Sequence, residues 1–120
     1  MRSKSSFLTL AAFIALASLA LPAEAHTKLV SSEPAANAEV ASPKSITLHF
    51  SEGFETKFSS VELTDTDGTD VSTMPMESKD ERALTVMPKA TLPPGLYTVM
   101  WTTVAHDSHK MSGSYSFTVK

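Results

Sequence analysis

The sequence predicts an all-β fold, a Greek-key sandwich or barrel of about seven short strands, and three observations support this prediction. Hydrophobic residues recur with a period of two along residues 26–120, as in strands with one buried face. Turn-forming residues separate these segments at short intervals. No stretch of this range carries a sustained helical period. We therefore expect one small domain with a single hydrophobic core.

Five segments show the alternation clearly. The apolar positions of the first three are Ile46, Leu48 and Phe50; Val61 and Leu63; and Leu84 and Val86. Two longer strands follow, with Tyr97, Val99, Trp101 and Thr103 on one face of the first, and Tyr115, Phe117 and Val119 on one face of the second. Turns are expected at residues 34–37, 42–43, 65–68 and 93–95.

The first 25 residues have the organisation of a secretory signal peptide. Arg2 and Lys4 form a basic start, residues 7–21 are almost wholly apolar, and residues 23–25 (Ala-Glu-Ala) match a small-x-small cleavage site. The apolar stretch is shorter than the roughly 20 residues that span a bilayer, and no later segment is apolar enough to stop transfer. We therefore expect residues 26–120 to be exported and not to span a membrane after cleavage.

Composition excludes two classes of protein. Residues 26–120 contain seven Lys and one Arg against twelve Asp and Glu, a net charge of −4 without long runs, which argues against a nucleic-acid partner. The chain has no cysteine, so a blue-copper centre, which requires a thiolate ligand, is excluded. Packing alone has to stabilise the domain.

Cleavage after Ala25 would make His26 the first residue of the mature chain. An N-terminal histidine offers its α-amine and imidazole Nδ1, which together close a chelate ring that favours Cu(II). The α-amine has an ordinary pKa of about 7.7 to 8.0 and must lose its proton to bind, so copper affinity is expected to fall in acid.

A second pair of candidate ligands lies between the last two predicted strands. Asp107 and His109 are two residues apart, so in extended backbone their side chains point to the same side and could meet one metal. Asp107 could bind the metal directly or orient a ligand through a hydrogen bond. An Asp-x-His sequence also occurs in solvated turns. Because the first and last strands of a Greek-key sandwich can lie close together, His26 strengthens the metal interpretation.

The chain resembles the CopC-like periplasmic copper-binding proteins over nearly all of residues 26–120. The resemblance is carried by the segments at residues 26–29, 31–35, 46–52, 92–101 and 107–119. It implies a Greek-key β-sandwich of cupredoxin-like or immunoglobulin-like appearance, and a Cu(II) site of the histidine-brace type. The family's ligands correspond here to His26, Asp107 and His109, with Glu52 matching a glutamate found in some members.

The resemblance also implies a function. It suggests a periplasmic protein that is not an enzyme and binds one Cu(II) ion as a carrier or buffer in copper resistance or copper uptake. A CopD-like inner-membrane copper transporter is the partner that the resemblance implies. Composition and spacing say nothing about that partner.

The remaining histidines and Trp101 have simpler interpretations. His49 alternates with Leu48 and Phe50 and should face outward on its strand. His106 would point away from Asp107 in extended backbone, so it is either a spectator or an extra donor where the loop bends. Trp101 is expected in the core.

Met74 and Met76 lie where two-site relatives carry a methionine-rich Cu(I) loop, but the dense cluster of those relatives is absent here. Both residues offer soft thioether donors, yet a third donor would be required. We therefore expect no strong Cu(I) site at Met74 and Met76, and a Cu(II)-only protein.

The sequence leaves two other classes of protein open. Lytic polysaccharide monooxygenases also use a histidine brace, so a copper-dependent oxidative enzyme is one alternative, although the chain is short and lacks an evident flat aromatic surface. The other alternative is a metal-free immunoglobulin-like adhesion or assembly module. In that case the N-terminal histidine would be an accident of processing.

Overall fold

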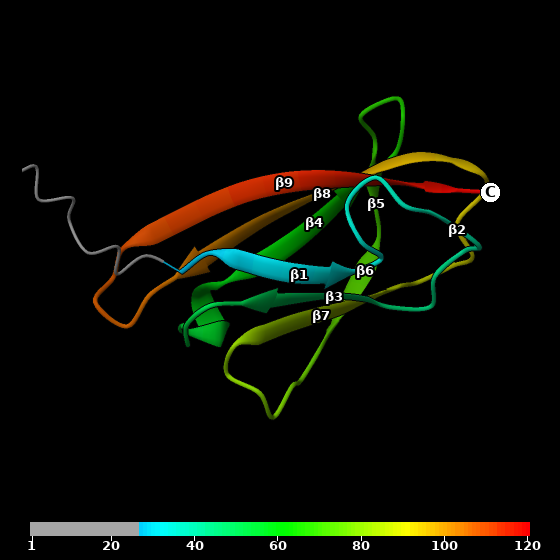
Figure 1. Cartoon of the computed structure of the whole chain (residues 1–120). Coiled ribbons are helices and arrows are strands. Elements are labelled where there is room, and N and C mark those ends of the chain that lie inside the picture. The colour runs from blue at the N-terminus through cyan, green and yellow to red at the C-terminus, as the bar shows by residue number, and fades with distance from the viewer. Residues whose placement is uncertain (1–26) are drawn as a thin grey trace, which may run out of the picture.

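Two β-sheets pack face to face in the computed structural model, which describes residues 27–120 (Figure 1). The four-stranded sheet contains, in spatial order, β1 (Leu29–Glu33), β3 (Ile46–Phe50), β7 (Ala83–Pro88) and β6 (Thr73–Met76). The five-stranded sheet contains β2 (Glu39–Val40), β9 (Lys110–Val119), β8 (Gly95–Val104), β4 (Ser60–Thr64) and β5 (Asp70–Val71). Within residues 27–120, the only helical element is one 3₁₀ turn, η1 (Thr56–Phe58). The predicted all-β sandwich is confirmed.

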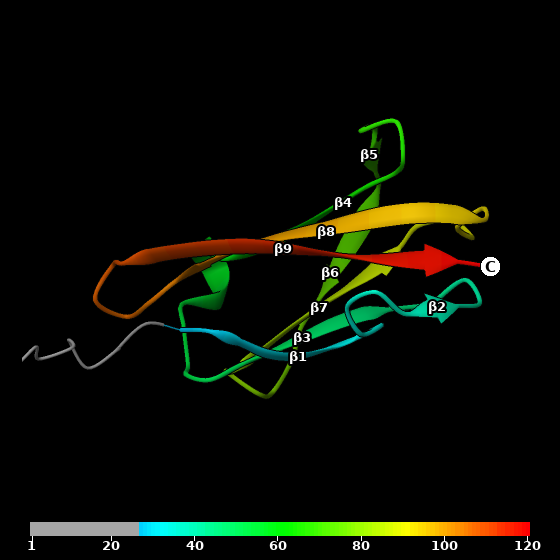
Figure 2. The same cartoon turned by 45° about the horizontal axis from the view of Figure 1, so that its top comes forward.

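The long hairpin of β8 and β9 forms the centre of the five-stranded sheet. Its antiparallel register runs from Gly95 opposite Val119 to Val104 opposite Lys110. β4 pairs antiparallel with β8 on one side, and the two-residue β2 pairs parallel with the end of β9 on the other. Only Ser72 separates β5 from β6, so the chain crosses there from one sheet to the other (Figure 2).

Burial follows the predicted alternation in most strands. The inward positions of β8 are buried as expected, and Trp101 is a core residue. In β7 the pattern departs from strict alternation, because Ala83 and Val86 are buried while Leu84 is only half-buried and packs against the core from its margin. The buried core consists of Ile46, Leu48, Phe50, Phe54, Val61, Leu63, Val86, Leu92, Tyr97, Val99, Trp101, Phe117 and Val119.

A cluster of aromatic rings fills part of the space between the sheets. Phe50 makes edge contacts with Phe54 and Trp101, at ring-centroid distances of 5.2 and 5.0 Å. Trp101 lies against Gly113 on the neighbouring strand, where a Cβ would come within 2.5 Å of the indole. The close packing of this ring therefore requires glycine at position 113.

The two ends of the sandwich carry different loops and different parts of the chain. β1 begins at the end that carries the β3–β4 connection and the β8–β9 loop, whereas Lys120 lies at the opposite end (Figure 1). No helix of residues 27–120 has the length and hydropathy needed to cross a membrane. The expected signal peptide (residues 1–25) and His26 lie outside the described residues.

Candidate metal centre

The loop that joins β8 to β9 is a compact turn. The N–H of Ala105 donates to the carbonyl of His109 at 2.8 Å, and the N–H of Ser108 donates to the carbonyl of Ala105, also at 2.8 Å. Ser108 has a φ of 76°, in the left-handed region. The extended backbone from which the Asp107 and His109 pairing was inferred is therefore absent from this loop, although the two side chains do meet.

Asp107 holds His109 through two hydrogen bonds. Its Oδ2 lies 3.0 Å from His109 Nδ1, and its Oδ1 accepts the backbone N–H of His109 at 3.1 Å. These contacts, the backbone bond first, hold the pKa of the Asp107 carboxyl below its ordinary value. An ionised Asp107 can only accept, so in this pair Nδ1 carries the proton. The geometry thus assigns Nε2 as the nitrogen that His109 would present to a metal.

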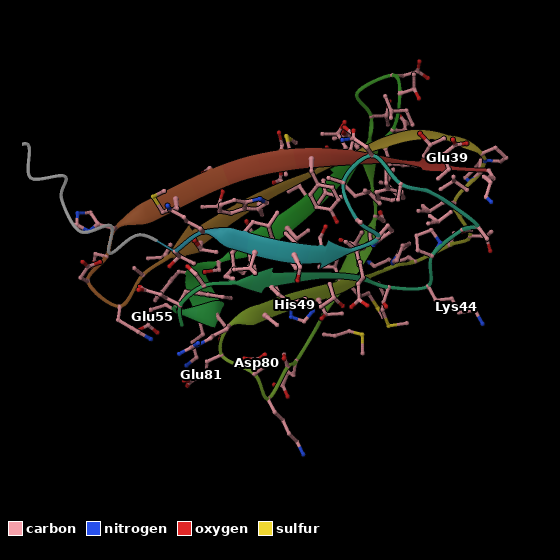
Figure 3. The ribbon with its side chains drawn as sticks, viewed as in Figure 1. Glu39, Lys44, His49, Glu55, Asp80 and Glu81 are labelled. Carbon is pink, nitrogen blue, oxygen red and sulfur yellow. The ribbon has the colours of Figure 1, made fainter. Side chains whose placement is uncertain are left out.

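His106, the other histidine of the loop, turns toward the β3–β4 connection. Its Nδ1 lies 2.7 Å from Oε1 of Glu55. The hydrogen bond to Glu55 and the charge of that carboxylate raise the pKa of His106 above its ordinary value. Figure 3 labels Glu55 at the end of the sandwich where the loop lies. His106 therefore bonds to a residue 51 positions earlier and not to Asp107.

Glu52 lies in the bend that follows β3, with an exposed side chain. Within residues 27–120, no group of three or more His, Cys, Asp or Glu side chains is placed to hold a metal ion. Glu52, Asp107 and His109 are thus not brought together as a three-residue site by the described part of the chain. Of the predicted ligands within residues 27–120, Asp107 and His109 are the two that contact each other.

The segment that directly follows His26 is held firmly against the sandwich. Thr27 is 1% exposed, and its hydroxyl has no hydrogen-bond partner within residues 27–120. The N–H of Lys28 donates to Ser51 Oγ at 2.9 Å, and the N–H of Ser51 donates to the carbonyl of Lys28 at 2.8 Å. The chain next to His26 is therefore fixed beside the residue that precedes Glu52.

The other candidates lie away from this end or face solvent. His49 is half-buried along the four-stranded sheet, with Nε2 at 3.6 Å from Oε1 of Glu33 (Figure 3). Met74 and Met76 lie on the edge strand β6, and both are exposed. Their i, i+2 spacing places both thioethers on one side of that strand.

Glu55 is the residue of this end that sequence reasoning missed. Glu55 follows Phe54 in a segment without clear periodicity, and it meets His106 only through the packing of two distant connections. The spacing of residues along the sequence does not predict such a contact. Only the tertiary structure shows it.

The fold and these residues describe a two-sheet protein with histidine–carboxylate pairs gathered at one end. A model of the CopC domain matches residues 29–120, and the chain belongs to the CopC domain family. Protein YobA of Escherichia coli strain K12 is 42% identical over 124 residues, covering 100% of both chains. The copper resistance protein C of Pseudomonas syringae pv. tomato is 39% identical over 125 residues, covering 98% of each.

Solved structures agree with this assignment. PcoC, described as a methionine-rich copper resistance protein from Escherichia coli, superposes with a TM-score of 0.76 at 39% identity, covering 80% of this chain and 100% of that one. CopC from Methylosinus trichosporium OB3b gives a TM-score of 0.73 at 35% identity, covering 79% and 94%. CopC proteins are copper-binding and copper-resistance proteins and not enzymes. Family membership therefore argues against both the oxidative enzyme and the metal-free adhesion module.

Proposed function

We propose that this protein is a periplasmic carrier or buffer that binds one Cu(II) ion through His26, Asp107 and His109. The observation that carries the proposal is the bond between Asp107 and His109 in the β8–β9 loop, at the end of the sandwich where β1 begins. Relatives named copper resistance protein C support a role in copper resistance. The ion is cargo, and its destination is a CopD-like inner-membrane copper transporter.

Each donor has a separate task in this site. His26 supplies its α-amine and one imidazole nitrogen, and His109 supplies Nε2, so that Cu(II) meets the nitrogen donors it prefers. Asp107 acts through His109: its carboxylate fixes the imidazole's orientation and tautomer, as such partners do in many metal sites. Glu52 stands in the bend beyond Ser51 as a further oxygen donor. Thr27, the next residue along the chain, is buried, which supports a role for the amine that cleavage before His26 would expose.

Protons compete with the metal for these donors. The α-amine has to lose its proton, so Cu(II) binding weakens as the pH falls below the amine's ordinary pKa of about 7.7 to 8.0. Asp107 does not limit binding in mild acid, because its hydrogen bonds keep its pKa below the ordinary value.

The protein binds Cu(II) and has no strong Cu(I) site. Met74 and Met76 are exposed on an edge strand, with Pro75 between them. Two thioethers without a third soft donor give weak Cu(I) affinity. The proposal thus sets this chain apart from its methionine-rich relative PcoC.

A comparison of two N-termini tests the site directly. Protein that begins at His26 is titrated with Cu(II) beside the same protein carrying one extra N-terminal alanine, with calorimetry and electron paramagnetic resonance as readouts. The extension removes the terminal amine of His26 from the chelate, so tight binding and the original spectrum should both be lost. Urea unfolding without copper serves as the control and should be the same for both forms. Equal binding by the two forms would overturn the proposal.

A further inference from the structure

The β8–β9 loop contains two imidazoles where the proposed copper site uses one. His106 and His109 are three residues apart on either side of Asp107, and their side chains are 60% and 67% exposed. Imidazole is a good ligand for copper, and both rings belong to the same short turn. If nothing held the two rings apart, this loop would offer Cu(II) more than one set of ligands.

The structure separates the two rings into different pairs. His109 Nδ1 bonds to Asp107, whereas His106 Nδ1 bonds to Glu55, at the shorter distance of 2.7 Å. The His106 ring lies over the β3–β4 connection, where a Cβ added to Gly53 would be 3.6 Å from Nε2. In agreement with this separation, residues 27–120 contain no cluster of three potential ligands.

Glu55 is well placed to restrain His106, because its backbone is fixed. The N–H of Glu55 donates to the carbonyl of Val104 at 2.7 Å, and the carbonyl of Glu55 accepts the hydroxyl of Ser59 at 2.8 Å. Ser59 Oγ in turn accepts the N–H of Val104 at 3.0 Å. The carboxylate therefore extends from a segment bonded to β8 just before the loop, which lowers the entropy cost of holding His106.

We propose that Glu55 is a positioning residue that holds His106 away from copper, so that His109 is the only histidine that the loop contributes to the site. This inference rests on the proposed function of the protein. A single ligand set gives one copper-bound state with one rate of release, which suits a protein that passes its ion on. With His106 released, its imidazole would compete with the other donors and create a second state.

Electron paramagnetic resonance of the Cu(II)-loaded protein beginning at His26 tests this inference. The wild-type protein should give one signal. Glu55→Ala should add a second signal with altered nitrogen coupling, because His106 becomes available as a donor. The double variant Glu55→Ala/His106→Ala should return to one signal. A structural role of Glu55 alone would not give this rescue.

A matched control comes from the other histidine–glutamate contact, between His49 and Glu33. Glu33→Ala removes a carboxylate from an imidazole in the same way, but at a site away from the loop, and should leave one signal. Circular dichroism checks that all variants are folded. An unchanged spectrum in Glu55→Ala, or a second signal that persists in the double variant, overturns the proposed role of Glu55. Neither result bears on the carrier proposal. Failure of the wild-type protein to bind Cu(II) overturns the carrier proposal and this inference with it.

Discussion

The two ends of the sandwich differ in the polar contacts that their ionisable side chains make. At the end that holds the turn at residues 65–68, Asp65 Oδ1 accepts the N–H groups of Asp67 and Thr69, and the hydroxyl of Tyr97 donates to the carbonyl of Pro93 at 2.7 Å. These side chains bond to backbone groups. At the loop end, imidazoles and carboxylates bond to each other and stay exposed to solvent.

Under the proposed function, this difference separates the residues that stabilise the fold from those that bind the metal. At the turn end, backbone groups that already bond to a side chain are not available to bind a ligand. Tyr97 also stacks on Phe117 as part of the core. Ligand-type side chains at the loop end are held by one another, so a metal can replace or add to their contacts. Substitutions at the turn end should therefore alter stability, and those at the loop end should alter copper binding.

The largest expected effect is on stability, from Phe117→Ala. Phe117 is fully buried beneath Tyr97, so its truncation should lower the free energy of unfolding by about 3–5 kcal/mol. Urea unfolding followed by tryptophan fluorescence measures this loss. Leu96→Ala, at an exposed position on the neighbouring strand, is the control and should cost far less. The folded fraction of Phe117→Ala should keep the wild-type copper spectrum, and an altered spectrum would contradict the separation of the two ends.

An intermediate effect on binding is expected from Asp107→Asn. Loss of the carboxylate that orients His109 should weaken Cu(II) binding about 10- to 100-fold, a free-energy change of about 1.4–2.7 kcal/mol. Competition with a chelator of known affinity measures the change. Asp67→Asn, in the exposed turn at the other end, should bind copper as the wild type does. Unfolding of copper-free Asp107→Asn should be nearly unchanged, because the side chain is exposed, and a large loss of stability would argue for a structural role.

The smallest effect is expected from Thr103→Val. Thr103 is fully buried, and its hydroxyl has no hydrogen-bond partner in the described range, residues 27–120. Replacement by an isosteric apolar side chain should leave the unfolding free energy equal or raise it by up to about 1 kcal/mol. Thr85→Val is the matched comparison, because the hydroxyl of Thr85 bonds to that of Thr47 at 3.1 Å. Loss of this hydrogen bond should lower the free energy of unfolding by about 1 kcal/mol. A clear destabilisation by Thr103→Val would show that the hydroxyl is satisfied in solution.

Alternation predicted the strands that carry the core, since each of β3, β4, β8 and β9 has one buried face. The two-residue strands β2 and β5 were not predicted, because two residues cannot show a period. β6 was also missed, because Pro75 argues against a strand except at a sheet edge, where β6 lies. About seven strands were expected, five of them located by alternation, whereas nine lie within residues 27–120.

The candidate site was predictable only where its residues are close in sequence. The side chains of Asp107 and His109 do meet, but the expectation came from an extended backbone that the loop does not have. The bond of His106 to Glu55 joins two connections 51 residues apart and leaves no pattern in the sequence. His26 lies outside the described residues, so its place in the site stays a prediction.

Lys120 ends the chain at the far side of the molecule from the β8–β9 loop (Figure 1). Its N–H donates to the carbonyl of Val40, which fixes the direction in which the chain leaves the sheet. A linker, affinity tag or solid support joined to Lys120 would therefore leave His109 facing away from the attachment point. Immobilised in this orientation, the protein would leave the proposed copper site accessible to added Cu(II) or to a second protein.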